Sequence, residues 1–201
     1  EELVYSHAVL HKNPEGYSRV MLAAAPLENI LRSFTLLKHA GLVPDEVTIS
    51  TVSLSNQFAV QRKDQAAAAV LYFDDGFADL MCMREGRLEF SRALTFRPGQ
   101  QVETFLNELK ATMAALSAQS LSPAKLTIAG KIPADEELLK QLKAVTGLDT
   151  DLSHDLDAAK KVAGAEPGIK INLLPEEYRI RKVREQHKRS LIYLGILFLL
   201  N

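Results

Sequence analysis

Several features are scarce in this 201-residue sequence, and each scarcity excludes a class of protein. The single cysteine, Cys82, excludes an internal disulfide and an all-cysteine metal site, and it fits a reducing compartment such as the cytoplasm. The 24 Lys and Arg against 25 Asp and Glu leave a net charge of −1, so the basic excess of a nucleic-acid-binding protein is missing. With 47% hydrophobic and 24% charged residues, the composition indicates one sizeable globular domain or two small ones.

Long apolar runs are also scarce. The uncharged run Leu191–Leu200 is only half of the roughly 20 residues that a membrane helix needs. The chain opens with Glu1 and stops at Asn201, so we expect it to be a piece of a longer protein, with residues 190–201 the start of a transmembrane helix. A basic juxtamembrane segment precedes this run and would keep the domain before it on the cytoplasmic side, beside lipid headgroups. Its basic residues are Arg179, Arg181, Lys182, Arg184, Lys188 and Arg189.

Residues 1–52 are predicted to form a small ββαβ subdomain. Two strand-like runs, 3–11 and 18–25, are joined by a turn that ends at Gly16. Apolar residues at helical spacing then predict a helix from residue 27, and Gly41 is a suitable stop. The β-branched residues of 47–52 predict the last strand.

Residues 53–165 are predicted to form a βββαβα lobe. Its three strands, 67–73, 78–83 and 87–96, form a meander. A helix of about five turns follows, a strand at 125–129 comes next, and a second helix ends before Gly147. A weaker helix is predicted at 156–163. The first helix should bury one apolar face against the meander, formed by Val102, Phe105, Leu106, Leu109, Met113 and Leu116.

Residues 166–189 begin as a linker and contain an apolar pentapeptide. We expect this pentapeptide to lie extended in an apolar groove, either of its own domain or of a neighbouring copy, because burial of each aliphatic side chain gains roughly 1.5–3 kcal/mol. The amide of Asn172 would bond to the groove backbone, and Pro175 would mark the start of the next helix. A free linker is the alternative. The pentapeptide consists of Ile171, Asn172, Leu173, Leu174 and Pro175.

Taken together, these patterns resemble a known family. The βββαβα order is that of one lobe of the ribonuclease-H-like, actin/Hsp70-type nucleotide-binding fold. The preceding subdomain resembles the extra subdomain of the FtsA and PilM branch, and residues 171–176, with Arg179 following, resemble the cytoplasmic N-terminus of PilN. The chain thus looks like the second half of a PilM-like domain running directly into a PilN-like or GspL-like membrane anchor.

The resemblance implies a structural role rather than an enzymatic one. The chain would be a cytoplasmic actin-like scaffold on the inner face of the bacterial inner membrane, in pilus assembly or type II secretion. It would link the motor ATPase to membrane components. The implied partners are that ATPase, a PilO- or GspM-like inner-membrane protein, a second copy of the chain and the membrane itself, but no nucleic acid.

The nucleotide motifs of the fold look degenerate. Actin-like ATPases carry an Asp-x-Gly phosphate turn followed by small or hydroxyl residues, whereas here Asp74, Asp75 and Gly76 are followed by Phe77, with a further acid at Asp79. In the adenine-side turn, Lys131 follows Gly130 where a second glycine is usual.

We therefore expect no ATP hydrolysis, no cofactor and no metal. An active ATPase in the longer protein, with ATP and Mg²⁺ switching partner affinity, is the alternative. A plain peptide-binding module is a third hypothesis.

Overall fold

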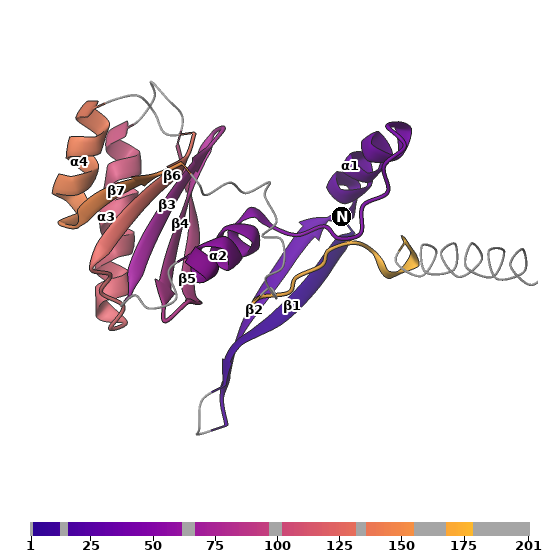
Figure 1. Cartoon of the computed structure of the whole chain (residues 1–201), viewed down its shortest axis with the longest axis horizontal. Helices are drawn as coiled ribbons and strands as arrows, with labels where there is room; N and C mark the ends of the chain where they lie inside the picture. Colours follow the sequence, from indigo (N-terminus) through magenta and orange to yellow (C-terminus); the bar gives the residue numbers. More distant parts are fainter. Residues whose placement is uncertain are drawn as a thin grey trace, which may run out of the picture. The chain divides into compact units, whose positions relative to one another are not determined.

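The computed structural model describes residues 2–12, 16–61, 67–96, 102–131, 136–154 and 168–178. The chain divides into two compact units, each made of segments that are distant in sequence. The smaller unit comprises Glu1–Ala8, Val20–Thr48 and the chain from Ile171 onward, and the larger comprises Val9–Arg19 and Ile49–Lys170. Figure 1 follows the order of elements along the chain.

The larger unit is built on a five-stranded mixed sheet. Strands β3 (Ala68–Asp74), β4 (Phe77–Arg84) and β5 (Arg87–Thr95) form an antiparallel meander. Strand β6 (Lys125–Gly130) pairs parallel with β3, and β7 (Asp149–Ser153) pairs parallel with β6. The strand order is therefore β5-β4-β3-β6-β7, and the carboxyl ends of β3 and β6 lie at the same edge.

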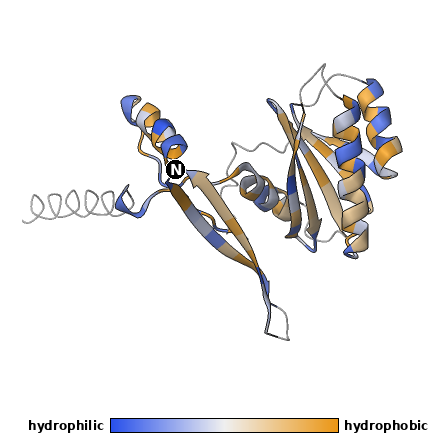
Figure 2. Cartoon of the chain, turned by 180° about the vertical axis from the view of Figure 1, so that it is seen from behind, coloured by the Kyte–Doolittle hydropathy of each residue, from blue (hydrophilic) through white to orange (hydrophobic). Residues whose placement is uncertain are grey.

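Helices α3 (Val102–Ala118) and α4 (Glu136–Thr146) cover one face of this sheet (Figure 1). The predicted packing of the first helix is confirmed, because its apolar face belongs to the same buried cluster as β3 and β4, with Val102 and Leu106 partly buried at the margin. Phe105 contacts the rings of Phe73 and Phe96 at centroid distances of 5.9 and 5.0 Å. Figure 2 shows hydrophobic residues along the strands that form this core.

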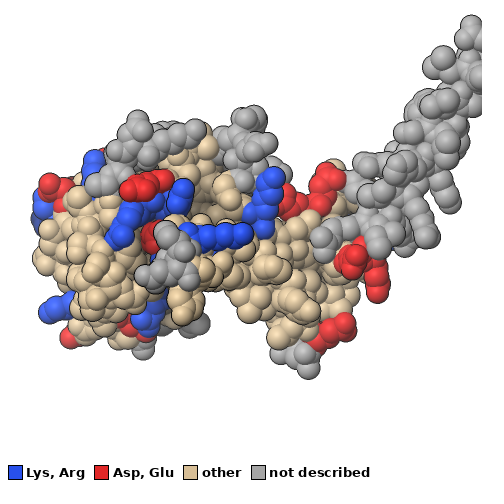
Figure 3. Space-filling view, turned by 90° about the horizontal axis from the view of Figure 1, so that it is seen from below, with Lys and Arg blue, Asp and Glu red and all other residues tan. Residues whose placement is uncertain are grey.

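The lone cysteine belongs to the same core. Cys82 on β4 is fully buried, and this burial raises the pKa of its thiol. On the surface seen in Figure 3, acidic and basic side chains both occur, in keeping with the near-zero net charge of the sequence.

In the smaller unit, strands β1 (Leu3–Lys12) and β2 (Ser18–Pro26) contribute part of their length, and helix α1 (Leu27–His39) follows. The predicted stop at Gly41 is confirmed. Gly41 has a φ of +75°, its N–H bonds to the carbonyl of Lys38, and the N–H of Leu42 bonds back to Leu37. These two bonds form a Schellman motif, which requires the left-handed conformation that glycine adopts without strain.

The predicted strand at 47–52 is wrong, because residues Ser50–Gln61 form helix α2. The buried residues of this segment include Thr51, Leu54, Ser55 and Phe58, which recur at intervals of three or four and so lie on one helical face. The β-branched residues suggested a strand, but tertiary burial of this face overrides their weak preference. The first part of the chain is therefore ββα followed by a second helix, not ββαβ.

The βββαβα order of the lobe is confirmed, and the structure adds β7 as a further edge strand. The predicted helix at 156–163, the basic segment after residue 178 and the apolar run 190–201 lie outside the described residues. Within the part of the chain that the structure describes, no helix has the length and apolar character needed to cross a membrane.

Candidate functional site: a held peptide segment and a paired acidic turn

The pentapeptide lies in the smaller unit as an irregular, buried segment. The side chains of Ile171, Leu173 and Leu174 are 0%, 1% and 2% exposed. Burial of this extent removes three aliphatic side chains from water, each worth roughly 1.5–3 kcal/mol. The apolar residues of the segment therefore do not face solvent.

Hydrogen bonds from residues far away in sequence satisfy the polar groups of this segment. The N–H of Leu173 donates to the carbonyl of Val47 at 2.7 Å, and the N–H of Asn172 donates to the Oγ of Ser6 at 3.3 Å. In return, the N–H of Val47 donates to Oδ1 of Asn172 at 3.2 Å. The same Oδ1 accepts the N–H of Leu174 at 2.9 Å, so one side-chain oxygen joins the segment to Val47 and shapes the segment itself.

The chain after the pentapeptide also contacts the smaller unit. Residues 176–178 form a helical turn directly after Pro175, whose missing N–H and fixed φ suit such a start. The N–H of Tyr178 donates to the Pro175 carbonyl at 3.0 Å. The Tyr178 ring lies against Phe34 of α1 with the ring centroids 4.6 Å apart. The unit thus holds the chain from residue 171 to residue 178.

The second candidate site is the turn between β3 and β4. Asp75 and Gly76 form the turn, and Gly76 has a φ of +84°. The Nζ of Lys131 lies 3.0 Å from Oδ1 of Asp74 and 2.5 Å from Oδ2 of Asp75. The hydrogen bond from Lys131 lowers the pKa of Asp74, and the two carboxylates raise the pKa of Lys131. The single ammonium group of Lys131 is therefore shared by the two carboxylates of this exposed cluster.

Parallel pairing of β3 with β6 brings the two predicted nucleotide turns together. Gly130 lies beside Phe73, and a Cβ at Gly130 would stand 2.2 Å from the Phe73 carbonyl oxygen, so only glycine fits there. The N–H of Lys131 donates to that same carbonyl at 2.8 Å, which directs its side chain toward Asp74 and Asp75. In addition, the N–H of Asp75 donates to Oδ1 of Asp74 at 2.8 Å, so this amide is engaged inside the turn.

Asp79 does not join this cluster. Along β4, Ala78 and Leu80 lie in the core under α3, and the intervening Asp79 faces the opposite side of the sheet. The Oγ1 of Thr51 on α2 donates to Oδ2 of Asp79 at 2.5 Å. The carboxyl is 4% exposed, and this burial raises its pKa. Asp79 therefore connects α2 with the sheet, away from the acidic turn.

The two motifs are visible in the sequence, but the residues that bond to the pentapeptide are not. Ser6 and Val47 lie 166 and 125 positions before Asn172, and neither carries a motif of its own. The residues of the basic segment, Arg179 to Arg189, lie outside the described part of the chain.

The meander, the parallel strands and the two helices on one face define the class: the larger unit has the fold of actin-like ATPases. A solved structure of the PilM-PilN type IV pilus biogenesis complex is similar, with a TM-score of 0.65 and 19% identity over 78% of this chain and 57% of that chain. A protein with an actin-like ATPase fold and unknown function from Bacteroides thetaiotaomicron VPI-5482 matches with a TM-score of 0.55 and 12% identity.

These structural similarities show the fold, which confirms the predicted actin-like architecture. The match to the Bacteroides protein covers 78% of this chain and 56% of that one, so the chain spans little more than half the length of either structure. A scan against protein-family models finds no match, and a search of curated proteins finds no significant one.

Proposed function

We propose that this chain belongs to a cytoplasmic scaffold of an inner-membrane pilus-assembly platform, and that its smaller unit holds a PilN-like segment of the same polypeptide. The observation that carries the proposal is the burial of Ile171, Leu173 and Leu174 together with the hydrogen bonds of Asn172. Similarity to a PilM-PilN complex supports it, because that assembly is named for two components whose counterparts would be joined here.

Covalent connection gives this arrangement a physical advantage. A segment tethered to its own domain experiences an effective concentration in the millimolar range for a short linker. Modest contacts are then sufficient to keep the segment bound. The domain would hold the chain at a fixed point just before the basic residues, which would lie against anionic headgroups. Such a scaffold transmits position and force and needs no chemistry of its own.

The proposed partners follow from this placement. The actin-like domain would present its surface to the motor ATPase, and the chain beyond the basic segment would meet a PilO- or GspM-like inner-membrane protein. The proposal also includes a GspL-like role in type II secretion, which would use the same architecture. A second copy of the chain is a further proposed partner.

The test is a double substitution, Leu173→Asp with Leu174→Asp, in the complete protein. The matched control is Leu42→Asp with Val43→Asp, an adjacent pair in the same unit whose side chains are 58% and 53% exposed. Buried carboxylates should expel the segment, because an unpaired charge is costly to bury. We expect the first variant to lose co-purification with membrane-platform proteins and the control to retain it. Equal recovery of platform proteins with both variants would contradict the proposal.

An actin-like ATPase that switches partners is the second candidate, because the fold itself is that of actin-like ATPases. The pairing of Lys131 with Asp74 and Asp75 supports the scaffold over the ATPase, since phosphate at this turn would compete with two carboxylates. Calorimetry of the complete protein with ATP and Mg²⁺ separates the two. A dissociation constant tighter than about 10 μM, or about −7 kcal/mol, would favour the ATPase.

A further inference from the structure

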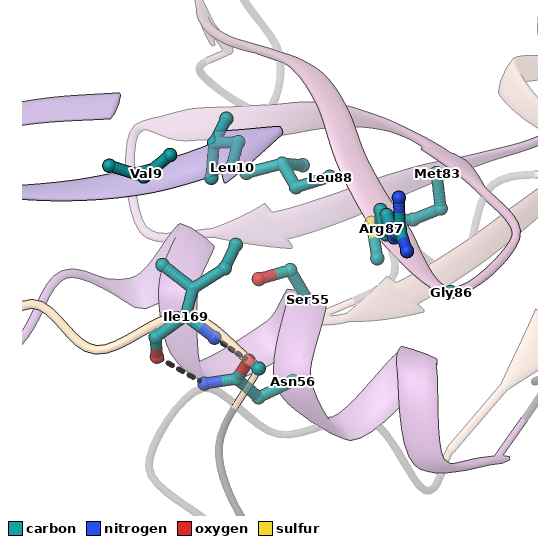
Figure 4. Close-up of a pocket in the computed structure, with 10 residues that line it drawn as sticks. Val9, Leu10, Ser55, Asn56, Met83, Gly86, Arg87, Leu88 and Ile169 are labelled. Carbon is teal, nitrogen blue, oxygen red and sulfur yellow. Dashed lines mark hydrogen bonds between the residues drawn. The ribbon is translucent and has the colours of Figure 1, made fainter. Parts of the chain in front are cut away.

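A second point of attachment precedes the pentapeptide, at Ile169 in the larger unit. The Asn56 side chain on α2 bonds to both backbone polar groups of this residue: its Nδ2 donates to the Ile169 carbonyl at 2.9 Å, and its Oδ1 accepts the Ile169 N–H at 3.0 Å. Figure 4 shows the two bonds side by side. This two-point pairing imitates one step of a β-ladder and satisfies the backbone whatever the side chain at this position.

A cavity of about 170 Å³ adjoins the same residue. Ile169 lines it together with four apolar side chains, Val9 and Leu10 of β1, Met83 of β4 and Leu88 of β5, while Ser55, Asn56 and Arg87 supply its polar side (Figure 4). An apolar cavity of about 150 Å³ is large enough to hold a benzene ring. Space for a group of that size is therefore available beside the Ile169 side chain.

We propose that Asn56 and this cavity form a peptide subsite that recognises residue 169 of the held segment. Asn56 fixes the backbone at this position, and the cavity accepts an aliphatic or aromatic side chain. The recognised segment then begins two residues before the pentapeptide. Its ligand class is an extended peptide with an apolar residue at this position, here supplied by the chain itself. This inference rests on the proposed role of residues 171–175 as a held peptide.

The subsite divides recognition between two kinds of contact. The carboxamide pairs with any residue that has a backbone N–H, so it provides affinity without choosing a sequence. The apolar part of the wall provides the choice, because a lysine side chain at position 169 would meet the Arg87 guanidinium there and no acidic lining residue. Neighbouring Lys170 is exposed and contributes no apolar contact, so selectivity upstream of the pentapeptide resides in residue 169.

The first experiment measures amide hydrogen exchange in the full chain. We expect Asn56→Ala to speed exchange at the Ile169 N–H at least tenfold, while exchange at the Leu173 N–H changes less than twofold. Asn56→Asp keeps an acceptor for this N–H and should retain its protection within about threefold, which separates the loss of the bond from a disturbance of α2. Asn107→Ala, an exposed change on α3, is the matched control. Unchanged exchange at the Ile169 N–H in Asn56→Ala would overturn the proposed role of Asn56.

The second experiment tests the cavity by nuclear magnetic resonance of the Met83 methyl group. In Ile169→Phe the ring should enter the cavity and shift this methyl resonance by ring current, whereas Lys170→Phe should leave the resonance unchanged. No shift in Ile169→Phe, or equal shifts in both variants, would overturn the side-chain part of the proposal. If either test fails while the Leu173 amide stays protected, the subsite alone is refuted. Loss of Leu173 protection in the unmodified chain would instead contradict the proposed function.

Discussion

The held peptide and the acidic turn are both short motifs of this chain, but different forces maintain them. The peptide contributes three side chains that are nearly inaccessible to water, and its bonds reach Ser6 and Val47 across more than a hundred residues of sequence. The turn contributes exposed charges that pair with Lys131 at the neighbouring strand end. Burial removes the first motif from solvent, whereas the second is exposed and its carboxylates are engaged by Lys131.

The largest expected effect concerns the core that supports the turn. Phe105→Ala removes a side chain that is 1% exposed and packs against Phe73 and Phe96. We expect a loss of about 3–5 kcal/mol in the free energy of unfolding, measured by urea denaturation. A loss below about 1 kcal/mol would show that α3 does not pack on the sheet as described.

A smaller effect is expected where the peptide is held. Asn172→Ala leaves the N–H groups of Val47 and Leu174 without their acceptor, and an unsatisfied buried donor costs about 1–3 kcal/mol. The loss should appear as faster amide exchange at both residues, with Asn29→Ala, an exposed change on α1, as the control. Equal exchange rates in the variant and the control would contradict the role of Asn172 as the acceptor for these two N–H groups.

The pH dependence of stability should distinguish Asp79 from Asp74. Burial raises the pKa of Asp79 above its ordinary value of 3.8, so the folded chain holds this proton more tightly than the unfolded chain does. Stability is therefore lost as pH rises from about 4 through the raised pKa. Asp79→Asn keeps an acceptor for Thr51 and should abolish that loss. The free energy of unfolding of the variant should therefore rise relative to that of the wild type between acid and neutral pH. Parallel stability curves for the two proteins across this range would refute the assignment.

The smallest effect is expected at the turn itself. The bond from Lys131 lowers the pKa of Asp74 below 3.8, so its contribution to stability is present above that pH and is lost as pH falls through the lowered value. Exposed pairs of this kind contribute little, and Lys131→Gln should leave the urea midpoint nearly unchanged. A carboxyl titration of Asp74 followed by nuclear magnetic resonance should show its pKa rising toward 3.8. An unmoved pKa would mean that the pairing does not persist in solution.

Local patterns in the sequence predicted much of the fold. The stop at Gly41 and the apolar face of α3 depend on neighbouring residues, and both are confirmed. Strand β7, Asp-Thr-Asp-Leu-Ser, has too few apolar residues to signal a strand and exists because it pairs with β6. The β-branched residues of 47–52 favour a strand, whereas residues 50–52 begin helix α2, whose burial depends on contacts with the sheet.

The two sites were predictable to different degrees. The apolar pentapeptide and the Asp-Asp-Gly turn are visible as motifs, but the partners of each depend on long-range contacts. Val47 has no recognisable signal, and Lys131 approaches Asp75 only because β6 pairs parallel with β3. Asn56 was not predicted at all, since a lone asparagine in a helix has no local pattern that marks it as a partner for Ile169.

The most direct test of the held-peptide account is residue-resolved amide exchange in the complete, unmodified protein, comparing Leu173 and Leu174 with Asp75. The first two amides bond to Val47 and to Asn172 inside a buried segment, whereas the third bonds to the adjacent side chain in an exposed turn. The account predicts that the two leucine amides exchange at least about a hundredfold more slowly than an unfolded chain, as buried bonded amides do, and that Asp75 stays near the unfolded rate. Leucine amides that exchange as fast as Asp75 would contradict it.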